Sequence, residues 1–231
     1  MLSLEGLALS SFKEVMVIAE GKTEFLFIKD ILAPYMALKG VYLHSVQVSK
    51  KGKKGGDVKF SRVSQDIARH LKQRSDIQVS LFVDYYGIDS QWPGLTKQGS
   101  LDEKISTLVK STIESLKEAF SDLSLERFTP YFAVHEFEAL LFSSPELIAK
   151  WLQCSVESVE KILSKYASPE EINNSKETAP SKRLQSLCNT GNYRKTTTGI
   201  AIAKEIGIDK MREKCPHFNN WIESLEALVS A

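Results

Sequence analysis

Acidic side chains follow three predicted strands, each at the point where the strand ends. They are Glu20, Glu24, Asp84, Asp89, Glu136 and Glu138. Because the carboxyl ends of parallel strands meet at one edge of a sheet, these carboxylates could converge there. Carboxylates hold hard cations such as Mg²⁺ or Mn²⁺, and such ions support phosphodiester hydrolysis. The pattern therefore predicts a metal-dependent phosphodiesterase site, although any one of these acids could equally be a solvated loop residue or a helix cap.

The first of these strands belongs to a strand, tight loop and helix that organise the chain. The apolar run 15–19 stops at Glu20-Gly21, and a segment with Phe25, Ile28 and Leu32 on one stripe follows at once. A short β-branched run, a glycine turn and then 3.6-residue apolar spacing predict this order of elements. Pro34 should kink or end the helix, or begin a short second piece through residue 37.

Strands and helices continue to alternate up to residue 143. Further strands are predicted at 41–48, 77–83 and 128–134, with helices at about 60–74 and 100–120. Ser100 and Glu103 fit a capping box at the start of the second of these helices. The alternation predicts an α/β fold with a mostly parallel sheet flanked by helices.

Beyond residue 143 the pattern becomes helical. Helices are predicted at about 145–153, 155–166, 181–188, 198–206 and 216–228. We therefore expect an N-terminal arm over 1–12, an α/β domain over 13–143 and a helical C-terminal subdomain over 144–231.

The composition excludes several classes of protein. A net charge of +1 over 231 residues provides no general basic field for nucleic acid. Three scattered cysteines without a CxxC spacing argue against a disulfide framework and a zinc knuckle. No apolar run approaches the roughly 20 residues that span a bilayer, and the N-terminus is a poor signal peptide. These observations predict a cytoplasmic protein without a membrane partner.

Two local groups of basic residues could still hold a nucleic-acid backbone. The first has five lysines and three glycines between residues 50 and 59, and the second lies at 182–183 and 193–195. Lysines with glycine-rich backbone suit phosphates, and an aromatic ring among cations can stack on a base. The predicted contacts are Lys22, Lys54, Lys59, Lys182, Arg183, Tyr193 and Arg194. The alternative interpretation is a solvated loop and an exposed turn.

Two familiar motifs fail on inspection. Gly21-Lys22-Thr23 would be a P-loop only if glycine stood at Met16. His135-Glu136 would begin a zinc-protease helix only if histidine stood at Ala139. His135 and Asp89 are therefore candidates for supporting a metal ligand by hydrogen bonding. His135 is also a candidate for acid–base catalysis.

Several segments together resemble a known group of proteins. AEGKTE, LFVDYYGID and FAVHEFEALLF resemble a Toprim-type domain, and more closely the bacterial family called domain of unknown function 4276. The similarity continues through PSKRL and CPHFNNW, so that it covers nearly the whole chain from about residue 13. Toprim domains occur in topoisomerases, primases, recombination proteins and the overcoming-lysogenization-defect nucleases. The resemblance implies divalent-metal-dependent phosphodiester chemistry, a role in phage defence and an ATPase partner of the SMC/ABC type.

The resemblance also assigns roles to particular residues. Glu20 matches the first Toprim acid, Glu24 the second acid of the nuclease-type subgroup, and Asp84 the first acid of the D-x-D element. Tyr86 stands where the second aspartate of that element is expected. Our hypothesis is that Glu136 or Glu138 replaces it.

These interpretations together predict a Mg²⁺- or Mn²⁺-dependent nuclease that acts on DNA or RNA. The expected catalytic residues are Glu20, Asp84, Glu136 and Lys195, and the expected metal ligands are Glu20, Glu24, Asp84, Glu136 and Glu138. Lys182 or Lys195 should contact the scissile phosphate. The alternative is a non-catalytic Toprim-like module that binds nucleic acid or nucleotide and regulates a partner ATPase. A phosphatase or nucleotide hydrolase with the same metal site is a third interpretation.

Overall fold

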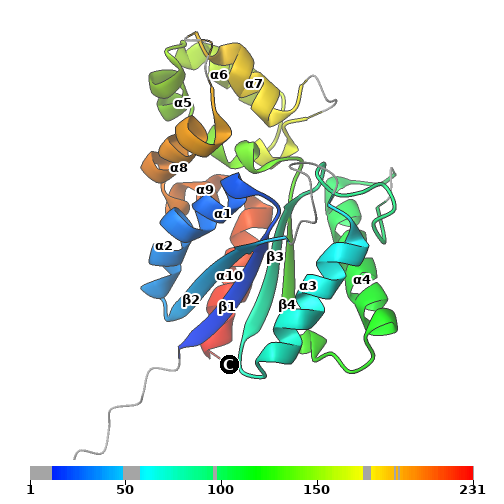
Figure 1. Ribbon diagram of the computed structural model, residues 1–231. Helices are drawn as coiled ribbons and strands as arrows, with labels where there is room; N and C mark the ends of the chain where they lie inside the picture. Colours follow the sequence, from blue (N-terminus) through cyan, green and yellow to red (C-terminus); the bar gives the residue numbers. More distant parts are fainter. Residues whose placement is uncertain are drawn as a thin grey trace, which may run out of the picture.

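A parallel sheet lies at the centre of the computed structural model, which describes residues 12–48, 58–95, 98–173, 178–189, 191 and 193–230. Within these ranges four strands pair in the order β2-β1-β3-β4, all of them parallel (Figure 1). The strands are β1 (Lys13–Ala19), β2 (Val41–Gln47), β3 (Gln78–Asp84) and β4 (Phe128–Ala133). The predicted parallel α/β fold is confirmed.

Four helices lie between the strands in sequence, and six more follow the last strand in the described part of the chain. The first four are α1 (Lys22–Phe27), α2 (Ala33–Ala37), α3 (Phe60–Gln73) and α4 (Leu101–Ala119). The others are α5 (Pro145–Leu152), α6 (Val156–Leu163), α7 (Pro180–Leu187), α8 (Ile200–Ile206), α9 (Ile208–Lys214) and α10 (Pro216–Ser230). Only α9 was not predicted from the sequence. No helix in the described residues is long and apolar enough to cross a membrane.

Each face of the sheet has its own apolar core. On one face, Val79, Leu81 and Val83 of β3 join side chains of α3 and α4. On the other face, Phe82 joins a core shared with α1, α10 and the C-terminal helices. The four consecutive or near-consecutive apolar residues of β3, which are Val79, Leu81, Phe82 and Val83, suit a central parallel strand that is covered on both faces. Figure 1 shows α3 and α4 on one side of the sheet and α10 on the other.

The last helix, α10, packs directly on the sheet. The Nε1–H of Trp221 donates to Ser80 Oγ at 3.0 Å, and Ser80 Oγ donates to the carbonyl of Thr129 at 2.6 Å. The indole ring also stacks on Tyr131, with ring centroids 4.7 Å apart. The region predicted as a helical subdomain therefore supplies one helix that completes the core of the sheet, whereas α5 to α8 lie beyond the carboxyl ends of the strands (Figure 1).

A π-turn over Ile28–Leu32 joins α1 to α2. Proline has no N–H and its ring clashes with the carbonyl four residues earlier, so Pro34 cannot continue a regular helix. The N–H of Ala33 instead donates to the carbonyl of Ile28, five residues back. One wider turn thus accommodates the proline. The prediction that Pro34 begins a short second helical piece through residue 37 corresponds to α2.

Candidate functional site

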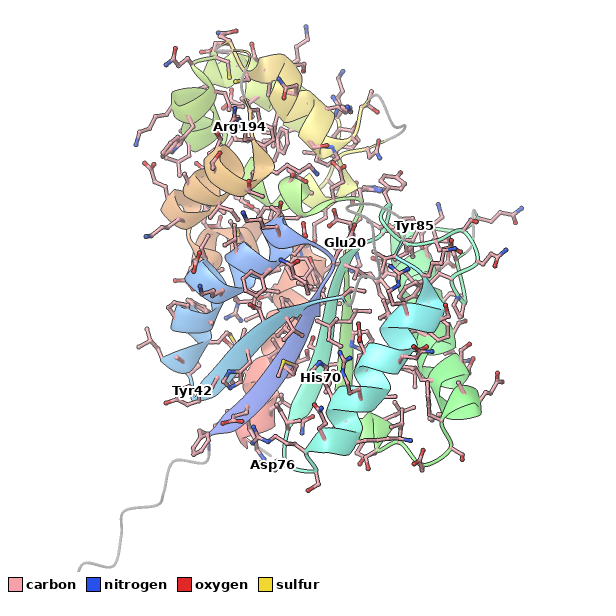
Figure 2. All side chains as sticks on the ribbon, in the orientation of Figure 1. Glu20, Tyr42, His70, Asp76, Tyr85 and Arg194 are labelled. Carbon is pink, nitrogen blue, oxygen red and sulfur yellow. The ribbon has the colours of Figure 1, made fainter. Side chains whose placement is uncertain are left out.

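Glu20 lies directly after β1, at the carboxyl edge of the sheet (Figure 2). Its backbone N–H donates to the carbonyl of Phe82 at 3.0 Å, and its Oε2 accepts the N–H of Asp84 at 3.0 Å. The loop after β3 passes so close that a Cβ at Gly87 would stand 2.6 Å from the carboxyl carbon of Glu20. The glycine of the Asp84–Gly87 turn therefore makes room for the Glu20 carboxylate.

Glu24 occupies the third position of α1 and is buried. Its Oε2 accepts the N–H of Gly21 at 3.0 Å, in the manner of a capping box. Burial raises the pKa of Glu24, the nearby Glu20 raises it further, and Lys195 partly opposes this rise. The spacing in Glu20-Gly21-Lys22-Thr23-Glu24 thus brings two carboxylates to the start of one short helix.

Asp84 is the last residue of β3 and is also buried. Its Oδ1 accepts the N–H of Phe137 at 2.8 Å, which ties the end of β3 to the segment after β4. Burial raises the pKa of Asp84 well above its ordinary value, and the charges of Glu24, Glu20 and Glu138 act in the same direction. Asp84, at the end of β3, therefore interacts electrostatically with acids that follow β1 and β4.

The segment after β4 places Glu136 and Glu138 on either side of one lysine. Lys195 Nζ lies 2.9 Å from Glu138 Oε2 and 3.8 Å from Glu136 Oε1. Glu136 is held in addition by Ser181, whose N–H and Oγ donate to its two carboxylate oxygens at 2.9 and 3.1 Å. Both glutamates therefore face the same site, which the sequence alone did not decide.

Glu138 is the most deeply buried of these acids, with 0% of its surface exposed. Burial raises its pKa to about 7, although Lys195 lowers it in part. Its second oxygen, Oε1, has no hydrogen-bond partner among the described residues. A buried carboxylate oxygen without a donor is costly, and carboxylate oxygens of this kind bind hard cations.

Lys195 is the cation at the centre of this arrangement, and a π-turn over Lys195–Gly199 holds it there. Burial alone would lower its pKa, but Glu138, Glu136 and Asp84 together raise it above its ordinary value. Lys195 is therefore a permanent positive charge at neutral pH. Its ammonium group lies near Glu136 and Glu138 and interacts electrostatically with Asp84 and Glu24.

His135 stands at the rim of the site in an unusual backbone conformation. Its φ is 65°, which few residues other than glycine adopt. Its imidazole stacks on the ring of Tyr86, with centroids 5.0 Å apart and planes inclined by 23°. Burial and the charge of Lys104 lower its pKa to about 4, so it is neutral at pH 7. Its Nδ1 has no hydrogen-bond partner in the described part of the chain.

Several of the predicted residues have other roles or lie apart from the acids. Asp89 Oδ1 accepts the N–H of Gln91 at 2.9 Å and so stabilises its own loop. Arg183 donates through Nε to the carbonyl of Thr178 and through a terminal nitrogen to Tyr166 Oη, at 2.8 and 2.9 Å. These bonds hold the guanidinium inside the C-terminal region rather than directing it toward a ligand.

The prediction that Tyr193 stacks on a base is wrong for this conformation. The side chain is 8% exposed, and a Cβ at Gly199 would lie 2.8 Å from its hydroxyl oxygen. The ring thus fills a space left by the absent glycine side chain. The other predicted basic contacts in the described ranges, which are Lys22, Lys59, Lys182 and Arg194, are exposed. Lys54 and residues 1–11 of the predicted arm lie outside these ranges.

The acids provide hard oxygen donors and excess negative charge, which suit a divalent cation. Within the described residues, no three His, Cys, Asp or Glu side chains are arranged as ready ligands of one ion. Gly87 and Ser181, which position Glu20 and Glu136, were not predicted as site residues. Gly87 could have been predicted from the DYYG motif. The contact between Ser181 and Glu136 joins residues 45 positions apart, and no sequence pattern indicates it.

The fold and the strand-end acids define an α/β protein with a carboxylate-rich site at the carboxyl edge of its sheet. The chain belongs to the family described as Domain of unknown function (DUF4276), whose sequence model matches residues 19–226. The family membership predicted from the motifs is thereby confirmed. No curated protein and no solved structure matches the chain.

Proposed function

We propose that this protein is a divalent-metal-dependent nuclease of Toprim type, which hydrolyses phosphodiester bonds in DNA or RNA. The observation that carries the proposal is the group of five carboxylates at the carboxyl edge of the sheet, in which burial and mutual repulsion raise the pKa values of Glu24, Asp84 and Glu138. Perturbed carboxyl groups gathered at one sheet edge are typical of functional sites. The Toprim resemblance and the sheet-edge position support the same interpretation.

Mg²⁺ or Mn²⁺ is the cofactor that fits these residues. Asp84 and Glu138 would hold the ion, and Glu20 and Glu24 would lie near it. Glu138 suits this role because its Oε1 has no hydrogen-bond donor among the described residues. One or two carboxylates suffice for Mg²⁺, which keeps several waters and takes substrate phosphate oxygens as well. When bound, such an ion polarises a phosphoryl oxygen and makes its bound water more acidic.

The residues of the chain itself would position the substrate. Lys195 Nζ is part-exposed between Glu136 and Glu138, so that a phosphate entering the site would meet a permanently charged donor. The two hydrogen bonds from Ser181 fix the position of the Glu136 carboxylate, so that it would stay in place if Lys195 moved toward a phosphate. Lys182, the exposed neighbour of Ser181, would contact the nucleic-acid backbone farther from the reacting bond.

The test is cleavage of supercoiled plasmid, linear duplex, single strands and bulk tRNA in the presence of Mg²⁺ or Mn²⁺. The wild type should cut at least one substrate, and Glu20→Ala and Asp84→Ala should not. Asp76→Ala is the matched control, because Asp76 pairs with Arg74 on the surface at the opposite end of the sheet (Figure 2). Full activity in a folded Asp84→Ala protein would refute the proposal.

A second candidate function is a non-catalytic module that binds nucleic acid or nucleotide and regulates an ATPase of the SMC/ABC type in phage defence. Two observations favour it, namely Tyr86 in place of the second aspartate and the ion pair that already joins Glu138 to Lys195. Calorimetry with Mn²⁺ separates the two functions. The enzyme should bind Mn²⁺ and lose binding in Asp84→Ala, whereas the module should bind little Mn²⁺ in either form.

A further inference from the structure

We propose that Tyr86 is a stacking platform for one unpaired nucleobase, so that the substrate class of the site is single-stranded or locally unpaired nucleic acid. The inference rests on the proposed function, because it names what the same site would bind. It also gives a role to the residue at which the chain departs from the D-x-D element.

Among the described residues, the Tyr86 ring is stacked on one face only. One face of the ring is covered by His135 at 5.0 Å and 23°, and Tyr85 meets it edge-on at 5.8 Å. The residue nevertheless remains 50% exposed, unlike the buried aromatic residues of the two cores. An aromatic ring with one covered face and large exposure can receive one more ring on its open side.

The platform is held rigidly beside the acids. The N–H of Tyr86 donates to the carbonyl of His135 at 3.2 Å, and the N–H of Tyr85 donates to the carbonyl of Ala133 at 2.9 Å. Gly87 closes the turn through its N–H to the carbonyl of Asp84 at 2.9 Å. The positive φ of His135 places the imidazole under Tyr86, and backbone strain of this kind is concentrated at functional sites.

The position of Tyr86 links a stacked base to the reacting phosphate. Tyr86 lies two residues after Asp84, and its supporting histidine directly precedes Glu136. Exposed Lys59 follows Val58, which bonds to the same loop through its N–H to the carbonyl of Gly87 at 3.0 Å. Aromatic platforms bordered by cations are the usual means of binding single strands, whereas bases within a duplex have both faces covered.

The experiment measures binding without hydrolysis. Fluorescence anisotropy with EDTA compares a labelled oligonucleotide, carrying one 2-aminopurine, with its duplex. Tyr86→Ala should weaken single-strand binding roughly 10- to 100-fold, as expected for the loss of one base stack, and should leave duplex binding unchanged. Tyr86→Phe and Tyr86→Trp should retain the affinity and the stacking-induced quenching of 2-aminopurine. Tyr42→Ala is the matched control, since Tyr42 is 47% exposed at the far end of the sheet (Figure 2).

The outcomes separate this inference from the proposed function. Unchanged single-strand affinity in Tyr86→Ala, equal losses in Tyr86→Phe, or no single-strand binding by the wild type would each overturn the platform. Metal-dependent cleavage lost in Asp84→Ala would still stand in those cases. Conversely, Tyr86-dependent binding by a protein that cleaves nothing would support the platform and refute the nuclease.

Discussion

Replacing Glu138 by glutamine should stabilise the protein at alkaline pH. Burial raises the pKa of Glu138 from 4.5 to about 7, so the folded state keeps a proton that the unfolded state releases. Stability due to this group is therefore lost as pH rises from about 4.5 through 7, and the loss is complete above that range. The difference between the two pKa values corresponds to about 3 kcal/mol.

Glutamine removes the ionisable proton but keeps an oxygen that can accept from Lys195. The free energy of unfolding of Glu138→Gln should consequently exceed that of the wild type by up to about 3 kcal/mol at pH 8. The two proteins should differ little near pH 3.5, about one unit below the pKa of the unfolded state, where the wild-type group is protonated in both states. Urea denaturation in EDTA at the two pH values measures this difference directly.

The control is Glu136→Gln, which removes the same charge from a carboxylate that accepts from Ser181 through both oxygens. This variant should not be stabilised, because an amide nitrogen would face one of the two donors. A Glu138→Gln protein that is destabilised at pH 8, or that differs from the wild type equally at both pH values, would refute the reasoning. Saturating Mn²⁺ should stabilise the wild type more than Glu138→Gln, and EDTA should reverse this gain.

Three further substitutions test the supporting structure. Gly87→Ala should displace the Glu20 carboxylate, break its hydrogen bond to the N–H of Asp84 and weaken Mn²⁺ binding measured by calorimetry, at a stability cost of about 1 kcal/mol; wild-type Mn²⁺ affinity would contradict it. Ser100→Ala removes the side-chain acceptor for the N–H of Glu103 at the start of α4 and should cost about 1 kcal/mol in urea denaturation. Trp221→Ala should cost about 3–5 kcal/mol, because the ring is 4% exposed, whereas Trp151→Ala, at 39% exposed, should cost much less.

The sequence predicted the sheet well because its strands are short apolar runs that end at turn residues. The site acids were predicted for the same reason, since the topology decides where strand ends meet. The orientation of Glu138 could not be predicted, because it depends on a 3₁₀ turn over Phe137–Ser143 rather than on a regular helix or strand. Lys195 could be named from its motif but not placed, since its partner is 57 residues away.

Local features without a strong sequence pattern account for the other differences. Helix α9 has only seven residues and follows Gly207 at a φ of 77°, so that its segment has too few turns to show an apolar stripe. Tyr193 was expected on the surface because its neighbours are basic. Its burial depends on the space at Gly199, which only the tertiary structure shows.

The contact between α10 and the sheet has a consequence for biosynthesis. Trp221 bonds to Ser80 across 141 residues of sequence. At about 5–20 residues per second, a ribosome needs roughly 7–30 s to make that length of chain. Until Trp221 has been made, Phe82 and Tyr131 lack the ring that covers them in the finished protein. The nascent chain should therefore depend on chaperones late in translation, and ribosome stalling before residue 216 should leave a sheet that is open to aggregation.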